Sequence, residues 1–318
     1  MTLPQFDLYL PETLEKAIEL SERFEHACTF LAGGTDLLVN NLDDLDVRKI
    51  LISLSKVDSL KEMTPTSIGA GVTIADLIRK QDIFPAIIGE TARLIAGPAL
   101  RESATIGGNL LLSGRCIHYN RTKLQRCASG ACMKADGEAC IAVPQNERCF
   151  APFSGDMAPV LMALNADFVL AGPAGERAVS SCSFFLEDGI QSNVLKPAEI
   201  LVRISLPADA KELDARYWKL RPRSAVDFPE AGVAVAVKRQ AGSLQELRVA
   251  LGALGPAPKV VHRNGPNVAG QSTQQLADSI WGELSPLVLA VRNTSFAPGY
   301  RREMTRLFLG RLLEELLS

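Results

Sequence analysis

Hydrophobic positions in the first hundred residues alternate between helical and strand-like spacing. Residues 11–24 carry apolar side chains at helical spacing and a proline in the first turn, which predicts an opening helix. The apolar run 29–32 predicts a strand, the turn 33–35 interrupts it, and 36–39 resumes as a short helix. The pattern therefore predicts a strand, a glycine turn and a helix in succession.

Similar patterns continue to residue 109 and resume after residue 153. Strands are predicted at 50–52 and 67–70, a helix capped by Thr73, and a second glycine turn at 105–109. Beyond the gap, the pattern predicts a helix from Asp156, strands at 168–170 and 200–204, an antiparallel meander through 217–220, 233–237 and 247–251, and a closing helix over 304–312. We predict an α+β fold with one domain at 1–205 and a second at 213–318.

The segment 114–153 differs from its surroundings because it is polar, rich in cysteine and only weakly periodic. It is too long for an ordinary connection inside a compact domain. We therefore predict an insertion in the first domain.

Composition narrows the possible functions. The 318 residues are 47% hydrophobic and 22% charged, enough to bury a substantial core. The net charge of -2 and the lack of a polybasic block argue against binding nucleic acid. No apolar run approaches the roughly 18 residues of a membrane span, and the N-terminus lacks a secretory pattern. We expect a cytoplasmic protein, in which cysteines serve as thiols or metal ligands.

The two glycine turns are candidate phosphate sites. Backbone amides in a glycine turn before a helix can donate hydrogen bonds to a pyrophosphate, and the missing side chains allow close approach. Neither turn has the spacing of a Rossmann fingerprint or a Walker A loop, and each can equally be an ordinary tight turn. Together, with hydroxyls from Thr35 and Thr105, they can line two sides of one extended cofactor.

Segments 31–37 and 104–109 resemble the paired FAD motifs of the medium, flavin-binding subunits of xanthine-dehydrogenase-type molybdenum hydroxylases. The resemblance extends through Asp156 and the Lys219 segment to the C-terminal motifs 249–253 and 300–302. It implies a two-part FAD-binding domain of the vanillyl-alcohol-oxidase-like (PCMH) type, followed by a CO-dehydrogenase-flavoprotein-like α+β domain. The FAD-binding residues that it implies are Leu31, Ala32, Gly33, Gly34, Thr35, Asp36, Leu37, Leu38, Thr105, Gly107, Gly108, Asn109, Asp156 and Lys219.

Simpler interpretations of two of these residues stay open. Asp156 can be an acid at a helix N-terminus that interacts with the helix dipole. Lys219 can be a solvated lysine on a strand.

Cysteines concentrate in the insertion, which holds five of the seven: Cys116, Cys127, Cys132, Cys140 and Cys149. Thiolate ligation of a soft metal centre can order a loop that has little core of its own. The loop has three more basic than acidic residues, which complements an anionic centre. Its spacing matches neither zinc knuckles nor the ferredoxin run, so a zinc site, an iron–sulfur cluster and unligated thiols all stay open.

An insertion at this place resembles the [4Fe-4S] loop in the flavoprotein subunit of 4-hydroxybenzoyl-CoA reductases. The resemblance implies Cys116, Cys132, Cys140 and Cys149 as cluster ligands and leaves Cys127 outside the set. The two remaining cysteines, Cys28 and Cys182, stand in apolar contexts and are predicted to be buried.

The resemblance implies an electron-transfer subunit without a catalytic residue of its own. Its partners would be a molybdopterin-containing large subunit, a [2Fe-2S] small subunit and a ferredoxin-like electron donor or acceptor. Two alternatives stay open: a flavoprotein subunit of a conventional molybdenum hydroxylase that passes electrons to NAD or another acceptor, and a zinc-structured interaction module.

Overall fold

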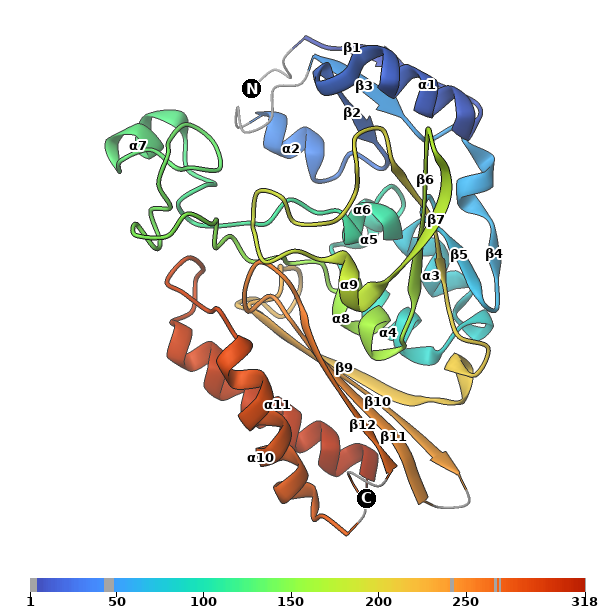
Figure 1. The fold of residues 1–318 in the computed structure, drawn as a ribbon, viewed down its shortest axis with the longest axis vertical. Coiled ribbons are helices and arrows are strands. Elements are labelled where there is room, and N and C mark those ends of the chain that lie inside the picture. Colours follow the sequence, from blue (N-terminus) through green and yellow to red (C-terminus); the bar gives the residue numbers. More distant parts are fainter. Residues whose placement is uncertain (1–4, 43–48, 241–242, 266–267, 269, 318) are drawn as a thin grey trace.

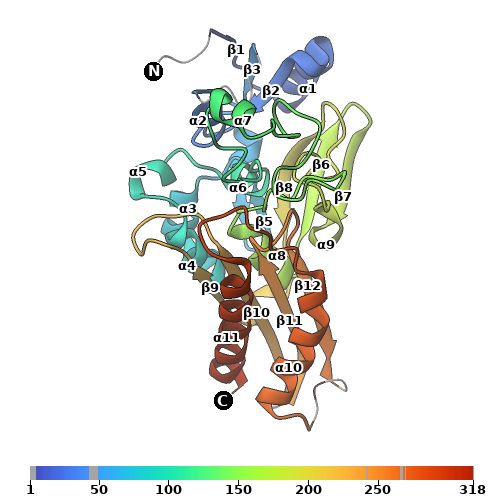
Figure 2. The same cartoon turned by 90° about the vertical axis from the view of Figure 1, so that its left-hand side faces the viewer.

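A computed structural model gives the fold of residues 5–42, 49–240, 243–265, 268 and 270–317. Three β-sheets follow one another along the long axis of the molecule, with the N-terminal sheet at one end and the C-terminal sheet at the other (Figure 1 and Figure 2).

The first sheet is small and parallel, with the strand order β1-β3-β2. Its elements are β1 (Asp7–Tyr9), α1 (Leu14–Phe24), β2 (Cys28–Leu31), α2 (Leu37–Leu42) and β3 (Ile50–Ser53). Helix α1 begins where the Thr13 hydroxyl accepts a hydrogen bond from the Lys16 amide at 3.2 Å. Ala17 and Leu20 of α1 share a buried cluster with Ile52 of β3. Cys28 of β2 belongs to the same cluster, so the glycine turn that follows β2 is attached to a strand packed against α1 and β3.

The second sheet is antiparallel, in the order β4-β5-β8-β6-β7. Its strands are β4 (Met63–Thr64), β5 (Ser67–Gly69), β6 (Asp167–Gly172), β7 (Gly175–Ser180) and β8 (Ile200–Ser205). The helices around it are α3 (Ile74–Arg79), α4 (Ala86–Leu94), α5 (Pro98–Arg101), α6 (Ile106–Leu110), α8 (Met157–Ala163) and α9 (Ser181–Phe184). Every residue of α8 is buried, so this helix forms the centre of the main core.

The third sheet is an antiparallel meander, β9 (Asp214–Leu220), β10 (Ala231–Gln240), β11 (Ser243–Gly252) and β12 (Lys259–Asn264). Helices α10 (Thr273–Leu284) and α11 (Pro298–Leu317) cover one face (Figure 1 and Figure 2). In β10 the valines of 233–237 pack towards these helices, whereas Ala234 and Ala236 belong to the main core around α8. Alternation of a large and a small residue thus lets one strand face two layers.

The insertion follows a mostly irregular path and projects from one side of the molecule (Figure 1). Its one described helix is α7 (Lys123–Ala128), which begins with a capping box of Thr122 and Gln125. Asn293, which precedes α11, binds both ends of the loop. Its carbonyl accepts from the Ile117 amide at 2.9 Å, and its side-chain amide donates to the Phe150 carbonyl at 2.6 Å.

Short 3-10 turns complete the described structure: η1 (Glu25–Ala27), η2 (Asp58–Lys61), η3 (Gln81–Ile83), η4 (Ala210–Glu212) and η6 (Ser285–Leu287). The elements predicted from the sequence are present, including the Thr73 cap of α3 and the three strands of the meander. Strands β1, β4, β7 and β12 and helices α4, α5, α7, α9 and α10 were not predicted, and the segment predicted as the second glycine turn is helical, because Gly107 and Gly108 lie inside α6. Within the described ranges, no helix is long and apolar enough to cross a membrane.

Candidate functional site

The first glycine turn packs directly against the chain that leads into the second. A Cβ atom on Gly33 would lie 1.8 Å from the carbonyl oxygen of Ser103, so only glycine fits this contact. Gly34 has φ +69°, a left-handed conformation that L side chains rarely adopt. The backbone of the first turn therefore lies against residues 103–104, directly before the second glycine segment.

Backbone amides at the first turn are available to a ligand. Among the described residues, none accepts a hydrogen bond from the amides of Gly33, Gly34, Thr35 or Asp36. Unsatisfied amides that converge ahead of a helix favour an anion. This turn has the composition and the open donors of a phosphate cradle.

The second turn is built differently. The amides of Ile106, Gly107 and Asn109 already donate to the carbonyls of Val72, Ala70 and Thr105 at 2.9–3.0 Å. The Gly108 amide donates to the Thr105 hydroxyl at 3.0 Å, so this hydroxyl caps α6. The second turn thus presents a closely packed backbone surface, whereas the open donors belong to the first turn.

Asp156 stands at the N-terminus of α8 but makes no capping hydrogen bond there. Its carboxylate instead accepts from the Tyr217 hydroxyl at 2.8 Å and from the Lys219 ammonium at 2.9 Å. The side chains of Lys219 and Asp156 are only 2% and 4% exposed, so the interpretation of Lys219 as a solvated lysine is wrong. The Lys219 ammonium also donates to the Leu94 carbonyl at 3.0 Å.

Burial dominates the electrostatics of this network. It raises the pKa of Asp156 and lowers the pKa of Lys219, while the opposite charge of each partner counteracts both changes. Burial and the neighbouring carboxylate raise the pKa of Tyr217 well above its usual value, so Tyr217 stays a hydrogen-bond donor. The network fixes β9 of the C-terminal sheet against α8 of the main core.

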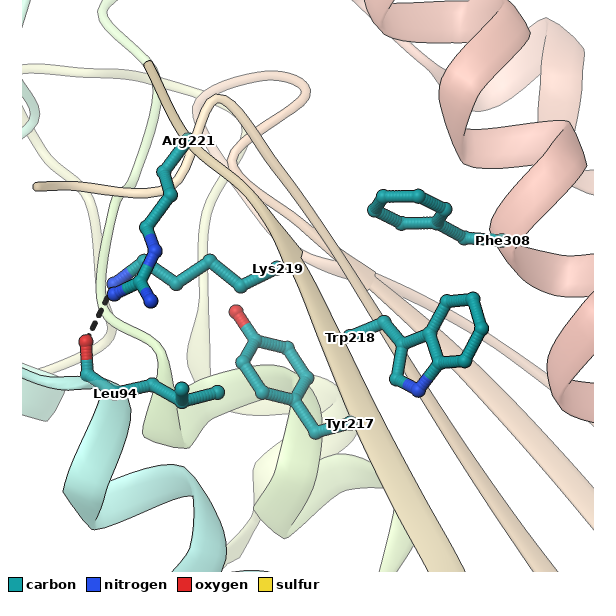
Figure 3. A pocket seen from close by; sticks show the side chains of 6 residues that line it. All are labelled: Leu94, Tyr217, Trp218, Lys219, Arg221 and Phe308. Atoms are coloured by element: carbon teal, nitrogen blue, oxygen red, sulfur yellow. Dashed lines mark hydrogen bonds between the residues drawn. The ribbon is translucent and has the colours of Figure 1, made fainter. Parts of the chain in front are cut away.

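A hollow of about 290 Å³ opens beside this network (Figure 3). The rings of Trp218 and Phe308 form one side, with centroids 5.4 Å apart in an edge-to-face arrangement. Figure 3 shows Arg221 above Lys219 and the hydrogen bond to the Leu94 carbonyl. The lining residues are Leu94, Tyr217, Trp218, Lys219, Arg221 and Phe308. None of them belongs to a glycine turn, so this hollow is separate from the amide cradle.

Arg115, which the sequence reasoning missed, connects the insertion to the first glycine turn. Its guanidinium forms an ion pair with Asp36 and lies 4.3 Å from the centroid of the Phe228 ring. Asn40 donates to the second carboxylate oxygen of Asp36 at 3.2 Å. The only signal in the sequence was the position of Arg115, directly before the first cysteine of the loop.

The cysteines of the insertion separate into two classes. Cys116, Cys132, Cys140 and Cys149 are buried, at 9%, 5%, 6% and 4% exposure, whereas Cys127 on α7 is exposed. Three of the buried cysteines share one packed cluster with Tyr119 and Ala151, and Cys140 is an electrostatic neighbour of Cys116 and Cys149. Outside the insertion, Cys28 is buried as predicted, but Cys182 is exposed, so its predicted burial is wrong.

Burial raises the pKa of Cys116, and it raises that of Cys149 to about 11. In the described ranges, no three His, Cys, Asp or Glu side chains are placed around a single metal ion. One tetrahedral zinc ion, with bonds of about 2.3 Å, needs sulfurs less than about 4 Å apart. Within the described part of the chain, the four buried thiols are not arranged around one such ion.

Comparison with known proteins identifies the family. Residues 4–209 match the model described as the FAD binding domain in molybdopterin dehydrogenase. The chain belongs to this family. The match confirms the expected resemblance to flavin-binding medium subunits and the expected FAD-binding fold.

Related proteins agree over most of the chain. The carbon monoxide dehydrogenase medium chain of Hydrogenophaga pseudoflava is 29% identical over 273 residues, covering 83% of this chain and 79% of that protein. The xanthine dehydrogenase FAD-binding subunit of Escherichia coli O157:H7 is 26% identical over 289 residues, covering 86% and 84%. Both are subunits of oxidoreductases by name.

Solved structures share the fold across the whole chain. A carbon monoxide dehydrogenase from Hydrogenophaga pseudoflava, lacking the Mo-pyranopterin moiety of its molybdenum cofactor, aligns with a TM-score of 0.75 at 24% identity, covering 99% of this chain and 98% of its own. Quinoline 2-oxidoreductase from Pseudomonas putida 86 aligns with a TM-score of 0.73 at 21% identity, covering 100% and 98%. The α+β fold, including its C-terminal meander and helices, is therefore shared with these solved chains.

Proposed function

We propose that this chain is the FAD-carrying electron-transfer subunit of a molybdenum-hydroxylase-type complex. The observation that carries the proposal is the first glycine turn, whose amides are open and whose backbone packs against the second turn. The names of the relatives, medium chain and FAD-binding subunit, support an assembly with other subunits. We infer a molybdopterin-containing large subunit and a [2Fe-2S] small subunit as partners.

In this proposal the pyrophosphate of FAD binds at residues 31–38, and Thr105, Gly107, Gly108 and Asn109 border the cofactor. When bound, FAD exchanges either two electrons or one, so it can couple a two-electron reaction to one-electron carriers. Asp156 and Lys219 form a closed ion pair, and their part is to fix β9 against α8 beside the site. The domains proposed are 1–205, with the insertion 114–153, and 213–318. The cytoplasmic location stays a prediction.

For the insertion we propose a [4Fe-4S] cluster held by Cys116, Cys132, Cys140 and Cys149. Support comes from burial and proximity, because these four cysteines are buried near one another while Cys127 faces solvent. Four thiolates are what such a cluster requires, and a cluster spreads its ligands more widely than a single ion does. The cluster supplies a one-electron carrier on the side of the molecule where Arg115 contacts Asp36.

Within this class, we propose a role like that of 4-hydroxybenzoyl-CoA reductases, in which electrons enter from a ferredoxin-like donor through the insertion. The excess of basic residues in the loop supports attraction of an acidic donor. A conventional hydroxylase that delivers electrons to NAD is the second candidate, because the relatives include carbon monoxide and xanthine dehydrogenases.

Cofactor analysis of the complex purified without oxygen tests the first part. We expect one FAD per chain after heat release and about four iron and four sulfide in the loop. Cys149→Ser should lose the iron and Cys127→Ser should keep it. Stoichiometric zinc would support the interaction-module alternative, and the absence of flavin would reject the flavoprotein assignment.

Stopped-flow reduction tests the direction. Rapid flavin reduction by a low-potential ferredoxin and slow reduction by NADH support the reductase-like role. Rapid electron delivery from the complex to NAD, unchanged after removal of the cluster, would reject that role in favour of the conventional hydroxylase.

A further inference from the structure

Lys134 places a cation beside the buried cysteines, over the ring of Tyr119 that packs with three of them, without a carboxylate partner. Its ammonium donates to the Gly114 carbonyl at 2.8 Å and lies 4.8 Å from the centroid of the Tyr119 ring. The groups that act on it electrostatically are first Cys149, Cys116 and Cys132, and then Asp36. Among the described residues, no carboxylate lies within ion-pair distance of this ammonium.

Neighbouring cations of the loop are compensated. The fully buried Arg126 pairs with Asp136 and also donates to the carbonyls of Tyr119 and Arg121. Arg115 pairs with Asp36. Among these three described cations of the insertion, Lys134 is therefore the exception.

A partly buried ammonium without a counter-charge is costly, because desolvation weakens its hydration. A backbone carbonyl and an aromatic face reduce this cost but supply no net negative charge. Three of its electrostatic neighbours are cysteines, and metal-bound cysteines are thiolates. A centre ligated by these cysteines would therefore provide the negative charge that Lys134 lacks.

We propose that Lys134 is a positioning residue that compensates the thiolate charge of the cluster and raises its reduction potential. This inference rests on the proposed [4Fe-4S] cluster. On reduction, one electron from a low-potential one-electron donor enters the centre, which becomes more negative by one unit while no proton moves. A fixed positive charge beside the thiolates stabilises the reduced form more than the oxidised form.

The test is an EPR-monitored redox titration of the anaerobic holo complex. Lys134→Met should lower the midpoint potential by an amount equal to at least a tenfold change in the one-electron equilibrium, about 59 mV. Lys134→Arg should restore it to near the wild-type value. Lys123→Met is the matched control, because it removes the same charge from an exposed position in the same loop, and it should leave the potential unchanged.

An unchanged potential in Lys134→Met, or an equal shift in Lys123→Met, overturns the inference. Iron content separates this failure from failure of the proposed cluster, since a wild-type complex without iron rejects the cluster itself. If Lys134→Met does not retain iron, Lys134→Gln is titrated instead, because its amide can still donate to the Gly114 carbonyl. Iron lost from both neutral variants but kept in Lys134→Arg supports charge compensation, and iron lost from all three overturns it.

Discussion

Replacing Gly33 with alanine tests whether the junction of the two glycine turns binds the flavin. The new Cβ would lie 1.8 Å from the Ser103 carbonyl oxygen, 2.6 Å from its carbonyl carbon and 3.1 Å from the Ala104 Cα. Ordinary contacts between such atoms are about 3.5 Å, so the two backbones must separate by about 1.5 Å. Overpacking of this kind costs about 1–3 kcal/mol, which a domain stable by about 5–15 kcal/mol survives.

Separation of the backbones moves the open amides of 33–36 away from the second turn. If about 1.4–2.8 kcal/mol of this cost weakens the binding free energy of FAD, the Kd for FAD rises about tenfold to a hundredfold. Titration of deflavinated protein with FAD, followed by the quenching of flavin fluorescence, measures this change.

Gly282→Ala is the matched control, because a Cβ there meets nothing within 4 Å and alanine favours the interior of α10. It should bind FAD as the wild type does. If Gly33→Ala folds with an unchanged Kd, the flavin does not depend on this junction and the proposed cradle is wrong.

Three further predictions concern stability. Asp156→Asn leaves Lys219 as an unpaired buried cation and should lower the free energy of unfolding, measured in urea, by about 3–5 kcal/mol. Adding Lys219→Met to this variant should recover part of the lost stability. A loss below about 1 kcal/mol in Asp156→Asn contradicts the buried ion pair. The Arg177–Glu199 ion pair lowers the pKa of Glu199 and should stabilise the fold by about 1 kcal/mol. This stabilisation should be fully present above the ordinary Glu pKa of 4.5 and should be lost as the pH falls through the lowered pKa of Glu199. A Tm difference between wild type and Glu199→Gln that persists at pH 2 argues against this. Leu309→Ala should lower the free energy of unfolding, followed by tryptophan fluorescence, by about 2–5 kcal/mol, because it removes a buried side chain from the core of the C-terminal sheet. FAD should stay bound in the folded variant. Loss of flavin before unfolding would show that the proposed domains are not separate units.

Local signals in the sequence were sufficient for most elements. The alternation over 233–237 and the Thr73 cap depend on neighbours along the chain, and both are found in the structure. Two readable signals were missed. Ser272 and Gln275 form the capping box of α10, and the two-residue period of β9 places Lys219 on the same buried face as Tyr217.

Long-range pairs could not be predicted in this way. Arg115 and Asp36 are 79 residues apart, and Asp156 and Lys219 are 63 apart. Such contacts depend on how separate layers pack, which no local period encodes. The same reason explains why the four cysteines could be grouped from the sequence only through a family resemblance, whereas their burial near one another is visible in the fold.

Asn293 has a consequence for the order in which the protein matures. This residue hydrogen-bonds both Ile117 and Phe150, at the two ends of the insertion. During synthesis the cysteine loop leaves the ribosome well over a hundred residues before Asn293 does. The loop therefore reaches its final geometry only after residue 293 has left the ribosome, and an assembly factor that delivers metal to the proposed cluster site would meet this geometry only from then on.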